Sequence, residues 1–107
     1  MTDQVIKLNT ESFEELYQKE GKLVVRLWAE WCGPCKMMSP IYNQVADNIA
    51  DEKLIMGEVD IDAFPAIATK LGVRGIPTVV IFENGKEVNR SVGLMPAPEL
   101  QKLILKE

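Results

Sequence analysis

The stretch that decides the fold is Trp28-Ala29-Glu30-Trp31-Cys32-Gly33-Pro34-Cys35-Lys36, and it contains both cysteines of the chain. Residues 23–28 are almost continuously apolar, which is typical of a strand covered on both faces. After the cysteines, apolar side chains recur at the spacing of one helix face, at Met38, Ile41, Tyr42, Val45 and Ile49. The sequence therefore predicts that the cysteines lie where a buried strand passes into the N-terminus of a helix.

Strands and helices alternate along the rest of the chain. We expect a short strand near the N-terminus, followed by a helix that Thr10 caps and Gly21 ends. A third helix is expected to begin at Pro65, and the last helix opens at Pro96 or Pro98. Together with the helix after the cysteines, this gives four predicted helices.

The order of the predicted elements determines the kind of sheet. Single helices connect the early strands, including those at 23–28 and 54–61, and such connections make strands parallel. The strands at 78–83 and 86–92 are separated only by Asn84-Gly85, the strongest short signal for an antiparallel hairpin. We therefore predict an α/β fold, with a mixed five-stranded sheet and four helices on both faces. No repeat or linker divides the sequence, so residues 1–107 are expected to form one domain.

Composition argues against several classes of function. The chain has a net charge of -4 and no long basic run, which argues against a nucleic-acid partner. No window approaches the roughly 18 apolar residues of a membrane span, so no membrane association is expected. The N-terminal residues carry neither the basic nor the apolar part of a secretory signal, and we therefore expect a cytoplasmic protein.

The spacing of the cysteines suits thiol-disulfide exchange, in which one thiolate attacks a disulfide and a second thiol resolves the mixed disulfide. Cys32 would lie at the helix entrance, where backbone N–H groups favour negative charge, so we assign it as the nucleophile. Cys35, one turn later, is the resolving thiol. Gly33 lets a partner's backbone approach closely, and Pro34 stiffens the first turn where its missing N–H costs little.

Two structural interpretations of the same cysteine pair must be considered. Cys-x-x-Cys is also half of a zinc site, but the chain has no histidine and no third cysteine, so no metal is expected. The pair could instead be two inert core cysteines. Flanking by Trp31, Gly33 and Pro34 disfavours that interpretation.

The cysteine stretch, together with Arg74-Gly75-Ile76-Pro77-Thr78 and Gly93, resembles the thioredoxin family from about residue 5 to the C-terminus. The resemblance implies the thioredoxin fold and a dithiol that reduces protein disulfides through reversible Cys32-Cys35 disulfide formation. It also implies recycling by a thioredoxin reductase that draws on NADPH, with no cofactor bound to the chain itself. We expect the protein to be a monomer.

The resemblance assigns further residues to the site. It places a cis proline beside the disulfide, at Pro77, which would leave the Ile76 backbone free to pair with an extended substrate. It also suggests Asp62 as a hydrogen-bond partner for the Trp28 indole. Each residue of the expected substrate groove could instead serve only the core or a turn. The expected groove comprises Trp31, Ile61, Gly75, Ile76, Gly93 and Leu94.

One pair of residues departs from the family pattern. Thioredoxins usually carry a buried aspartate at the position of Arg26 and a lysine at that of Glu58, so the two signs are exchanged here. We expect Arg26 to pair with Glu58 beneath Cys35, because an unpaired buried charge is costly. Such a cation should favour thiolate and make the couple more oxidising, and Glu58 becomes a candidate proton acceptor. Alternatively, Arg26 reaches water along apolar surface and Glu58 is merely exposed.

This departure leaves two other functions open. A more oxidising couple would suit an oxidant or isomerase of protein disulfides. The domain could also be a binding subunit that uses the same groove, with incidental redox chemistry. The intact Gly33-Pro34 dipeptide favours the reductant.

Overall fold

The computed structural model describes residues 4–106, which form five strands and four helices. The strands are β1 (Val5–Lys7), β2 (Lys22–Trp28), β3 (Leu54–Asp60), β4 (Thr78–Glu83) and β5 (Lys86–Val92). The helices are α1 (Thr10–Tyr17), α2 (Gly33–Ile49), α3 (Pro65–Leu71) and α4 (Ala97–Leu105). No helix among these residues has the length and apolar character of a membrane span.

The strands build one mixed sheet in the order β1-β3-β2-β4-β5. β3 runs parallel to β1 and β2, as the single-helix connections predict. β4 runs antiparallel to both β2 and β5. Asn84 and Gly85 turn the β4–β5 hairpin with φ values of 53° and 88°, a region that these two residue types tolerate. The predicted five-stranded mixed sheet is therefore confirmed.

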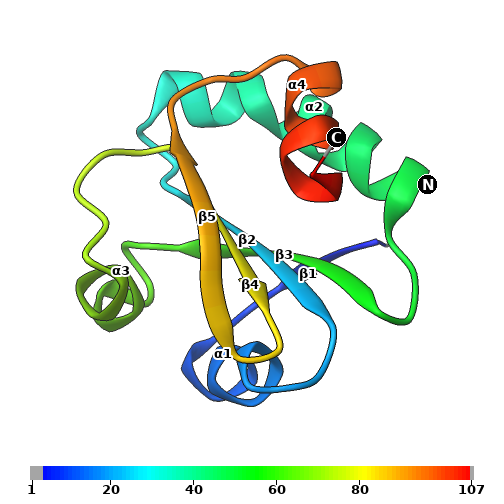
Figure 1. Cartoon of the computed structure of the whole chain (residues 1–107). Coiled ribbons are helices and arrows are strands. Elements are labelled where there is room, and N and C mark those ends of the chain that lie inside the picture. Colours follow the sequence, from blue (N-terminus) through cyan, green and yellow to red (C-terminus); the bar gives the residue numbers. More distant parts are fainter. Residues whose placement is uncertain (1–3, 107) are drawn as a thin grey trace.

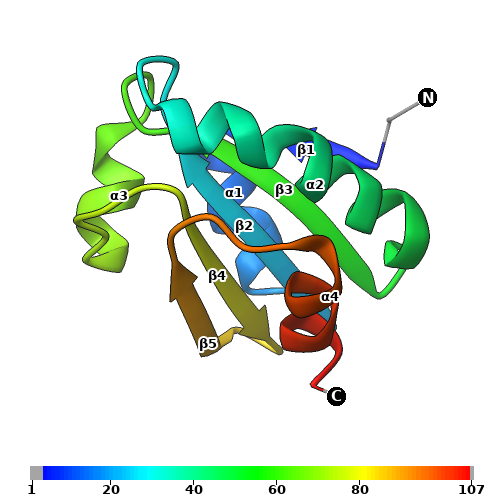
Figure 2. The ribbon, with the colours of Figure 1, turned by 90° about the horizontal axis from the view of Figure 1, so that it is seen from above.

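Helices cover both faces of the sheet (Figure 1). α2 and α4 lie on one face, and α1 and α3 lie on the other. The view from above in Figure 2 looks down on α2 and α4, with the strands behind them. The core under α2 and α4 includes Val24, Met38, Tyr42, Met56 and Leu100. The core under α1 and α3 includes Phe13, Val25, Leu27, Val59 and Phe82. β2 contributes to both cores, so it is buried on both faces as predicted.

The cap of α1 is Asn9, and the prediction of Thr10 was wrong. The Asn9 side chain accepts the Ser12 N–H at 2.8 Å, and the Ser12 hydroxyl accepts the Asn9 N–H at 2.9 Å. This reciprocal capping box needs a polar side chain three residues after the cap. Three residues after Thr10 stands Phe13, which cannot reciprocate.

Gly21 belongs to the turn before β2 and does not end α1. The helix ends four residues earlier, at Tyr17, so this part of the prediction was also wrong. Gly21 has a φ of 105°, and a Cβ there would lie 2.8 Å from the carbonyl oxygen of Lys53. Its N–H donates a 2.7 Å hydrogen bond to the Asn84 side chain. The glycine therefore joins this turn to the β4–β5 hairpin.

The remaining helix boundaries follow their proline and glycine signals. α3 begins at Pro65, and Gly72 caps its end in the left-handed conformation with a φ of 67°. Pro96 is the N-cap of α4, so it opens the last helix, and Pro98 lies in the first turn.

Candidate active site

The two cysteines form a disulfide at the start of α2, with their Cα atoms 5.2 Å apart. Cys32 is the N-cap of α2, and its Sγ accepts a hydrogen bond from the Cys35 N–H at 3.1 Å. Cys32 is 5% exposed, whereas Cys35 is fully buried at 0%. Cys32 therefore offers the more accessible of the two sulfurs.

The first turn of α2 favours negative charge at Cys32. The first N–H groups of a helix lack partners within the helix and carry partial positive charge. In the reduced protein, the Cys35 N–H that contacts Cys32 Sγ would stabilise a thiolate and lower the pKa of that thiol. Pro34 lies in the same turn, where a missing N–H costs little. A Cβ on the exposed Gly33 would meet nothing within 4 Å, which leaves open space beside the sulfur.

Two segments that are distant in the chain meet beside Cys32. The Ile76-Pro77 peptide bond is cis, as the resemblance predicts. Cys32 Sγ lies 3.8 Å from the carbonyl oxygen of Ile76, and both Ile76 and Ile61 pack against the cystine. The Pro77 carbonyl accepts a 2.8 Å hydrogen bond from the N–H of Gly93. The predicted groove residues Ile61 and Ile76 therefore contact the disulfide, and Gly93 is bonded to the residue that follows Ile76.

Large apolar side chains are exposed in the segments around the cysteines and around Gly93. Trp31 and Leu94, both predicted groove residues, are 68% and 45% exposed. Met37 and Val92 are exposed to a similar degree, and sequence reasoning did not single out Val92. A Cβ on Gly75 would contact Val92 Cγ1 at 3.4 Å, so Val92 lies beside a predicted groove residue. Val92 ends the last strand and directly precedes Gly93, and this position in the sequence could have identified it as a neighbour of the predicted groove.

Asp62 bonds to Trp31, and the predicted bond to Trp28 is wrong. Trp31 Nε1 donates a 2.9 Å hydrogen bond to Asp62 Oδ2. Trp28 is half-buried and packs against the cystine instead. The Trp31 indole, in the turn before α2, therefore makes this hydrogen bond to the connection between β3 and α3.

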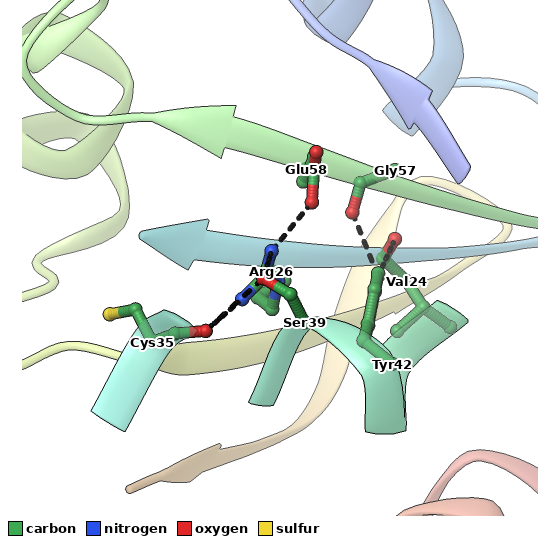
Figure 3. A network of polar contacts seen from close by, with 7 residues as sticks. All are labelled: Val24, Arg26, Cys35, Ser39, Tyr42, Gly57 and Glu58. Atoms are coloured by element: carbon green, nitrogen blue, oxygen red, sulfur yellow. Dashed lines mark hydrogen bonds and ion pairs between the residues drawn. The ribbon is translucent and has the colours of Figure 1, made fainter. Parts of the chain in front are cut away.

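Arg26 lies in the middle of β2, is only 2% exposed, and contacts both α2 and β3 (Figure 3). Its Nη1 donates to the main-chain carbonyl of Cys35 at 2.7 Å. Its Nη2 donates to Glu58 Oε2 at 2.7 Å and to Ser39 Oγ at 3.1 Å. Arg26 and Glu58 are direct partners in the β2–β3 register. The predicted ion pair is confirmed, and the alternative in which Arg26 reaches water is wrong.

Sequence reasoning missed two residues of this network, Ser39 and Tyr42. The guanidinium carbon of Arg26 lies 5.4 Å from the centre of the Tyr42 ring and 5.6 Å from that of Trp28. Aromatic faces at such distances stabilise a cation. Arg26 Nε has no hydrogen-bond partner within the described part of the chain. The spacing of Ser39, four residues after Cys35 on the same helix, could have identified it.

The Tyr42 hydroxyl joins α2 to the two central strands. It lies 3.0 Å from the carbonyl oxygen of Val24 and 2.7 Å from that of Gly57. Burial raises the pKa of Tyr42 far above its ordinary value, because a phenolate would lose its hydration there. The hydroxyl therefore stays protonated and remains a donor to the strand carbonyls.

Solvent reaches the Arg26 network at Glu58. The Glu58 side chain is 14% exposed and opens onto a pocket of about 350 Å³. The pocket is lined by Lys7, Leu8, Trp28, Glu58, Asp60, Ala63 and Phe64. The carboxylate therefore connects the buried charge to this pocket.

A family model described as Thioredoxin matches residues 4–106. The chain belongs to the thioredoxin family. It is 45% identical over 86 residues to the thioredoxin of Chlamydia muridarum, covering 80% of this chain and 82% of that relative. It is 39% identical over 101 residues to the thioredoxin of Acidithiobacillus ferridurans, covering 94% and 93%. A solved mutant thioredoxin from Halobacterium salinarum NRC-1 superimposes with a TM-score of 0.87 at 28% identity, covering 98% of this chain and 91% of that one.

Membership of the thioredoxin family, together with the Cys32-Cys35 disulfide, establishes the class of reaction. This thioredoxin is a thiol-disulfide oxidoreductase of the protein-disulfide reductase type. Neither a disulfide oxidant or isomerase nor a redox-independent binding subunit is favoured. Thioredoxins work with a reductase and with disulfide-bearing substrates, and they bind no cofactor. Within residues 4–106, no three His, Cys, Asp or Glu side chains are grouped so as to hold a metal ion.

Proposed function

We propose that this thioredoxin is a dithiol reductant in which Cys32 attacks the target disulfide and Cys35 resolves the mixed disulfide. The observation that carries the assignment is the place of Cys32 at the N-cap of α2, where its sulfur accepts the Cys35 N–H at 3.1 Å. The fully buried Cys35 is shielded from the target until the mixed disulfide has formed. Residues 1–107 act together as a single thioredoxin domain.

The proposed reaction moves two electrons from the protein to the target. The Cys32 thiolate attacks one sulfur of the target disulfide, forms a mixed disulfide and releases the other target sulfur as a thiolate. Cys35 then loses its proton and attacks Cys32 Sγ. This second step forms the Cys32-Cys35 disulfide, breaks the bond between Cys32 and the target, and releases the remaining target sulfur as a thiolate.

The target lies in the groove beside Cys32. An extended target segment pairs with the backbone of Ile76, whose carbonyl oxygen is 3.8 Å from Cys32 Sγ. Gly33 leaves room for the target backbone, Pro34 stiffens the first turn of α2, and Pro77 shapes the segment that carries Ile76. The proposed groove consists of Trp31, Ile61, Gly75, Ile76, Gly93 and Leu94.

Arg26 places a positive charge beneath the redox centre. Its guanidinium contacts the main chain of Cys35, and Figure 3 shows the Cys35 sulfur on the opposite side of that residue. The charge therefore acts on the sulfurs through space. A cation there favours thiolate, lowers the pKa of the thiols and stabilises the reduced form, which makes the couple more oxidising than it would be without Arg26.

Glu58 is the proposed acceptor for the Cys35 proton. Figure 3 shows the Arg26 guanidinium between Glu58 and the Cys35 carbonyl, so the proton travels through water rather than by direct contact. Glu58 then returns the proton to solvent through the pocket that it lines. An acceptor that is both close to the network and open to water suits this transfer.

A thioredoxin reductase that draws on NADPH recycles the oxidised protein by reducing its disulfide. We place this electron-carrying cycle in the cytoplasm, because a dithiol reductant is suited to a reducing compartment. The protein acts as a monomer on disulfide-containing proteins. A net charge of -4 without a long basic run supports protein partners over nucleic acids.

A trapping experiment tests the assignment of the two sulfurs. The reduced Cys35→Ser variant, mixed with insulin as a disulfide-bonded protein, should accumulate a mixed disulfide through Cys32. The matched Cys32→Ser variant should trap little insulin, because its remaining thiol is buried. Non-reducing electrophoresis and mass spectrometry identify the bonded cysteine. Equal trapping by the two variants would overturn the assignment, and failure of NADPH with thioredoxin reductase to drive insulin reduction would overturn the proposed cycle.

A further inference from the structure

The hydroxyl of Ser39 lies inside the network beneath the disulfide, yet the proposed reaction gives it no role. Its Oγ accepts a 3.1 Å hydrogen bond from Arg26 Nη2. It also donates to the Cys35 carbonyl oxygen at 3.3 Å. Arg26 Nη1 contacts that same carbonyl at 2.7 Å. Serine, carbonyl and guanidinium therefore form a closed set of contacts between α2 and β2. Figure 3 shows Ser39 beside the guanidinium, next to Cys35.

Ser39 helps to determine the orientation of the guanidinium plane. Arg26 Nη2 has two acceptors from different elements, Glu58 Oε2 on β3 and Ser39 Oγ on α2. A planar guanidinium held at several donors loses its freedom to rotate. Without the hydroxyl, the guanidinium would keep one hydrogen bond to α2 within the described residues, to the Cys35 carbonyl, beside its contact with the Tyr42 ring. One hydroxyl that accepts from Arg26 and donates to Cys35 thus ties the charge to the helix of the redox centre.

We propose that Ser39 is a positioning residue of the redox centre, whose hydroxyl fixes the Arg26 guanidinium against the first turns of α2. In this way it sets how strongly the positive charge favours the reduced, thiolate-bearing form. The inference rests on the proposed function, in which Arg26 stabilises thiolate. Ser39 acts through Arg26, because its hydrogen bonds within the described residues go to Arg26 and to the Cys35 main chain.

Replacing the hydroxyl should make the couple more reducing. In Ser39→Ala the guanidinium loses one acceptor and the Cys35 carbonyl loses one donor, so the charge is held less firmly and the thiolate is less stabilised. We expect the equilibrium constant for reduction by glutathione to fall about threefold. Because a tenfold change corresponds to about 30 mV for two electrons, this is a shift of about 14 mV toward more negative potential.

Two further variants separate positioning from a general effect of substitution in α2. Ser39→Thr keeps a hydroxyl that can reach the carbonyl four residues earlier, so its equilibrium constant should stay close to that of the wild type. Ser91→Ala on β5 is the matched control, because the Ser91 hydroxyl is buried without a hydrogen-bond partner in the described structure. It should leave the equilibrium unchanged. Free thiols are counted after equilibration in glutathione buffers, and the Cys32 pKa is read from the pH profile of alkylation.

A second set of variants tests whether Ser39 acts through Arg26. In an Arg26→Gln background, Ser39→Ala should no longer change the equilibrium constant, and a persistent threefold change would overturn the proposal. An effect of Arg26→Gln without any effect of Ser39→Ala would also overturn it, while leaving the proposed role of Arg26 intact. If Arg26→Gln leaves the equilibrium unchanged, the proposed role of Arg26 itself fails. If the Arg26→Gln protein does not fold, Ser39→Ala and Ser39→Thr in the wild-type chain still test the proposal. Equal changes of the equilibrium constant in these two variants would exclude a role for the hydroxyl.

Discussion

The guanidinium of Arg26, on β2, donates a 2.7 Å hydrogen bond to the main-chain carbonyl of Cys35, on α2. This contact ties the helix of the resolving cysteine to the centre of the sheet. Because Arg26 is also bonded to Glu58 at 2.7 Å, the charge that touches the redox helix is compensated within the fold. The chemistry of the sulfurs should therefore respond to changes in either partner.

Replacing Arg26 by aspartate should raise the pKa of the Cys32 thiol. The change removes a cation from beneath the redox centre and adds an anion, so we expect a rise of about one unit. The rate of alkylation of Cys32 as a function of pH measures this value. Arg26→Lys, which keeps a cation, is the control and should move the pKa much less. A fall or no change in Arg26→Asp would contradict the electrostatic role of Arg26.

Replacing Glu58 by glutamine should slow the resolution of the mixed disulfide. The amide keeps the shape of the side chain but cannot accept the Cys35 proton at neutral pH, so we expect a loss of about tenfold or more. Rapid acid quenching followed by mass spectrometry measures the decay of the mixed disulfide. Asp60→Asn is the matched control, since Asp60 lines the same pocket. If Glu58→Gln resolves as fast as the wild type, Glu58 is not the acceptor.

Tyr42 should make the oxidised protein sensitive to alkaline pH. Its pKa is raised by burial in the native state, whereas an unfolded tyrosine ionises near about pH 10. The unfolded state therefore loses this proton first. Above the pKa of the unfolded tyrosine, the free energy of unfolding should fall by up to about 1.4 kcal/mol for each pH unit. Below that pKa, the stabilisation that comes from the buried, protonated Tyr42 is fully present.

Tyr42→Phe should remove this alkaline loss, as measured by urea unfolding of the oxidised form at several pH values. At neutral pH the same variant should cost about 1–3 kcal/mol, because the carbonyls of Val24 and Gly57 lose a buried donor. Tyr17→Phe is the control and should retain the steeper alkaline decline. Identical pH dependence in Tyr42→Phe and the wild type would refute the prediction.

Asn9→Ala should destabilise the protein by about 1 kcal/mol, because the Ser12 N–H loses its partner at the start of α1. Thr10→Ala should cost less, since Thr10 is only the first residue of the helix. Urea unfolding of the two variants measures the difference. A larger loss for Thr10→Ala would show that the cap lies one residue later in solution.

Much of the fold followed from spacing along the sequence. The alternation of strands with single helices and the Asn84-Gly85 turn predicted the mixed five-stranded sheet and its hairpin, but not the order of the strands. The cap of α1 was harder, because Asn9 and Thr10 are adjacent and both are good caps. Only the side chain three residues after each distinguishes them, and only Ser12 can complete the capping box.

Residue patterns alone predicted the cysteine pair of the candidate site, but not the geometry around it. Pro77 was expected to be cis only from the family resemblance, because a cis bond before proline is uncommon in general. The indole that bonds to Asp62 was misassigned, since Trp28 and Trp31 are only three residues apart and their directions depend on the path of the turn. Ser39 was missed although its spacing from Cys35 places the two residues on one face of α2, because the sequence does not show that this face meets Arg26.

The pairing of Arg26 with Glu58 also limits how this sequence can change over generations. Starting from the usual aspartate and lysine of the family, a single replacement at either position sets like charges opposite each other in the β2–β3 register. Each one-step intermediate is therefore expected to be less stable than both end states. Substitutions at the two positions are therefore coupled in their effect on stability. A variant of this chain that carries the family's usual pair must exchange both residues together.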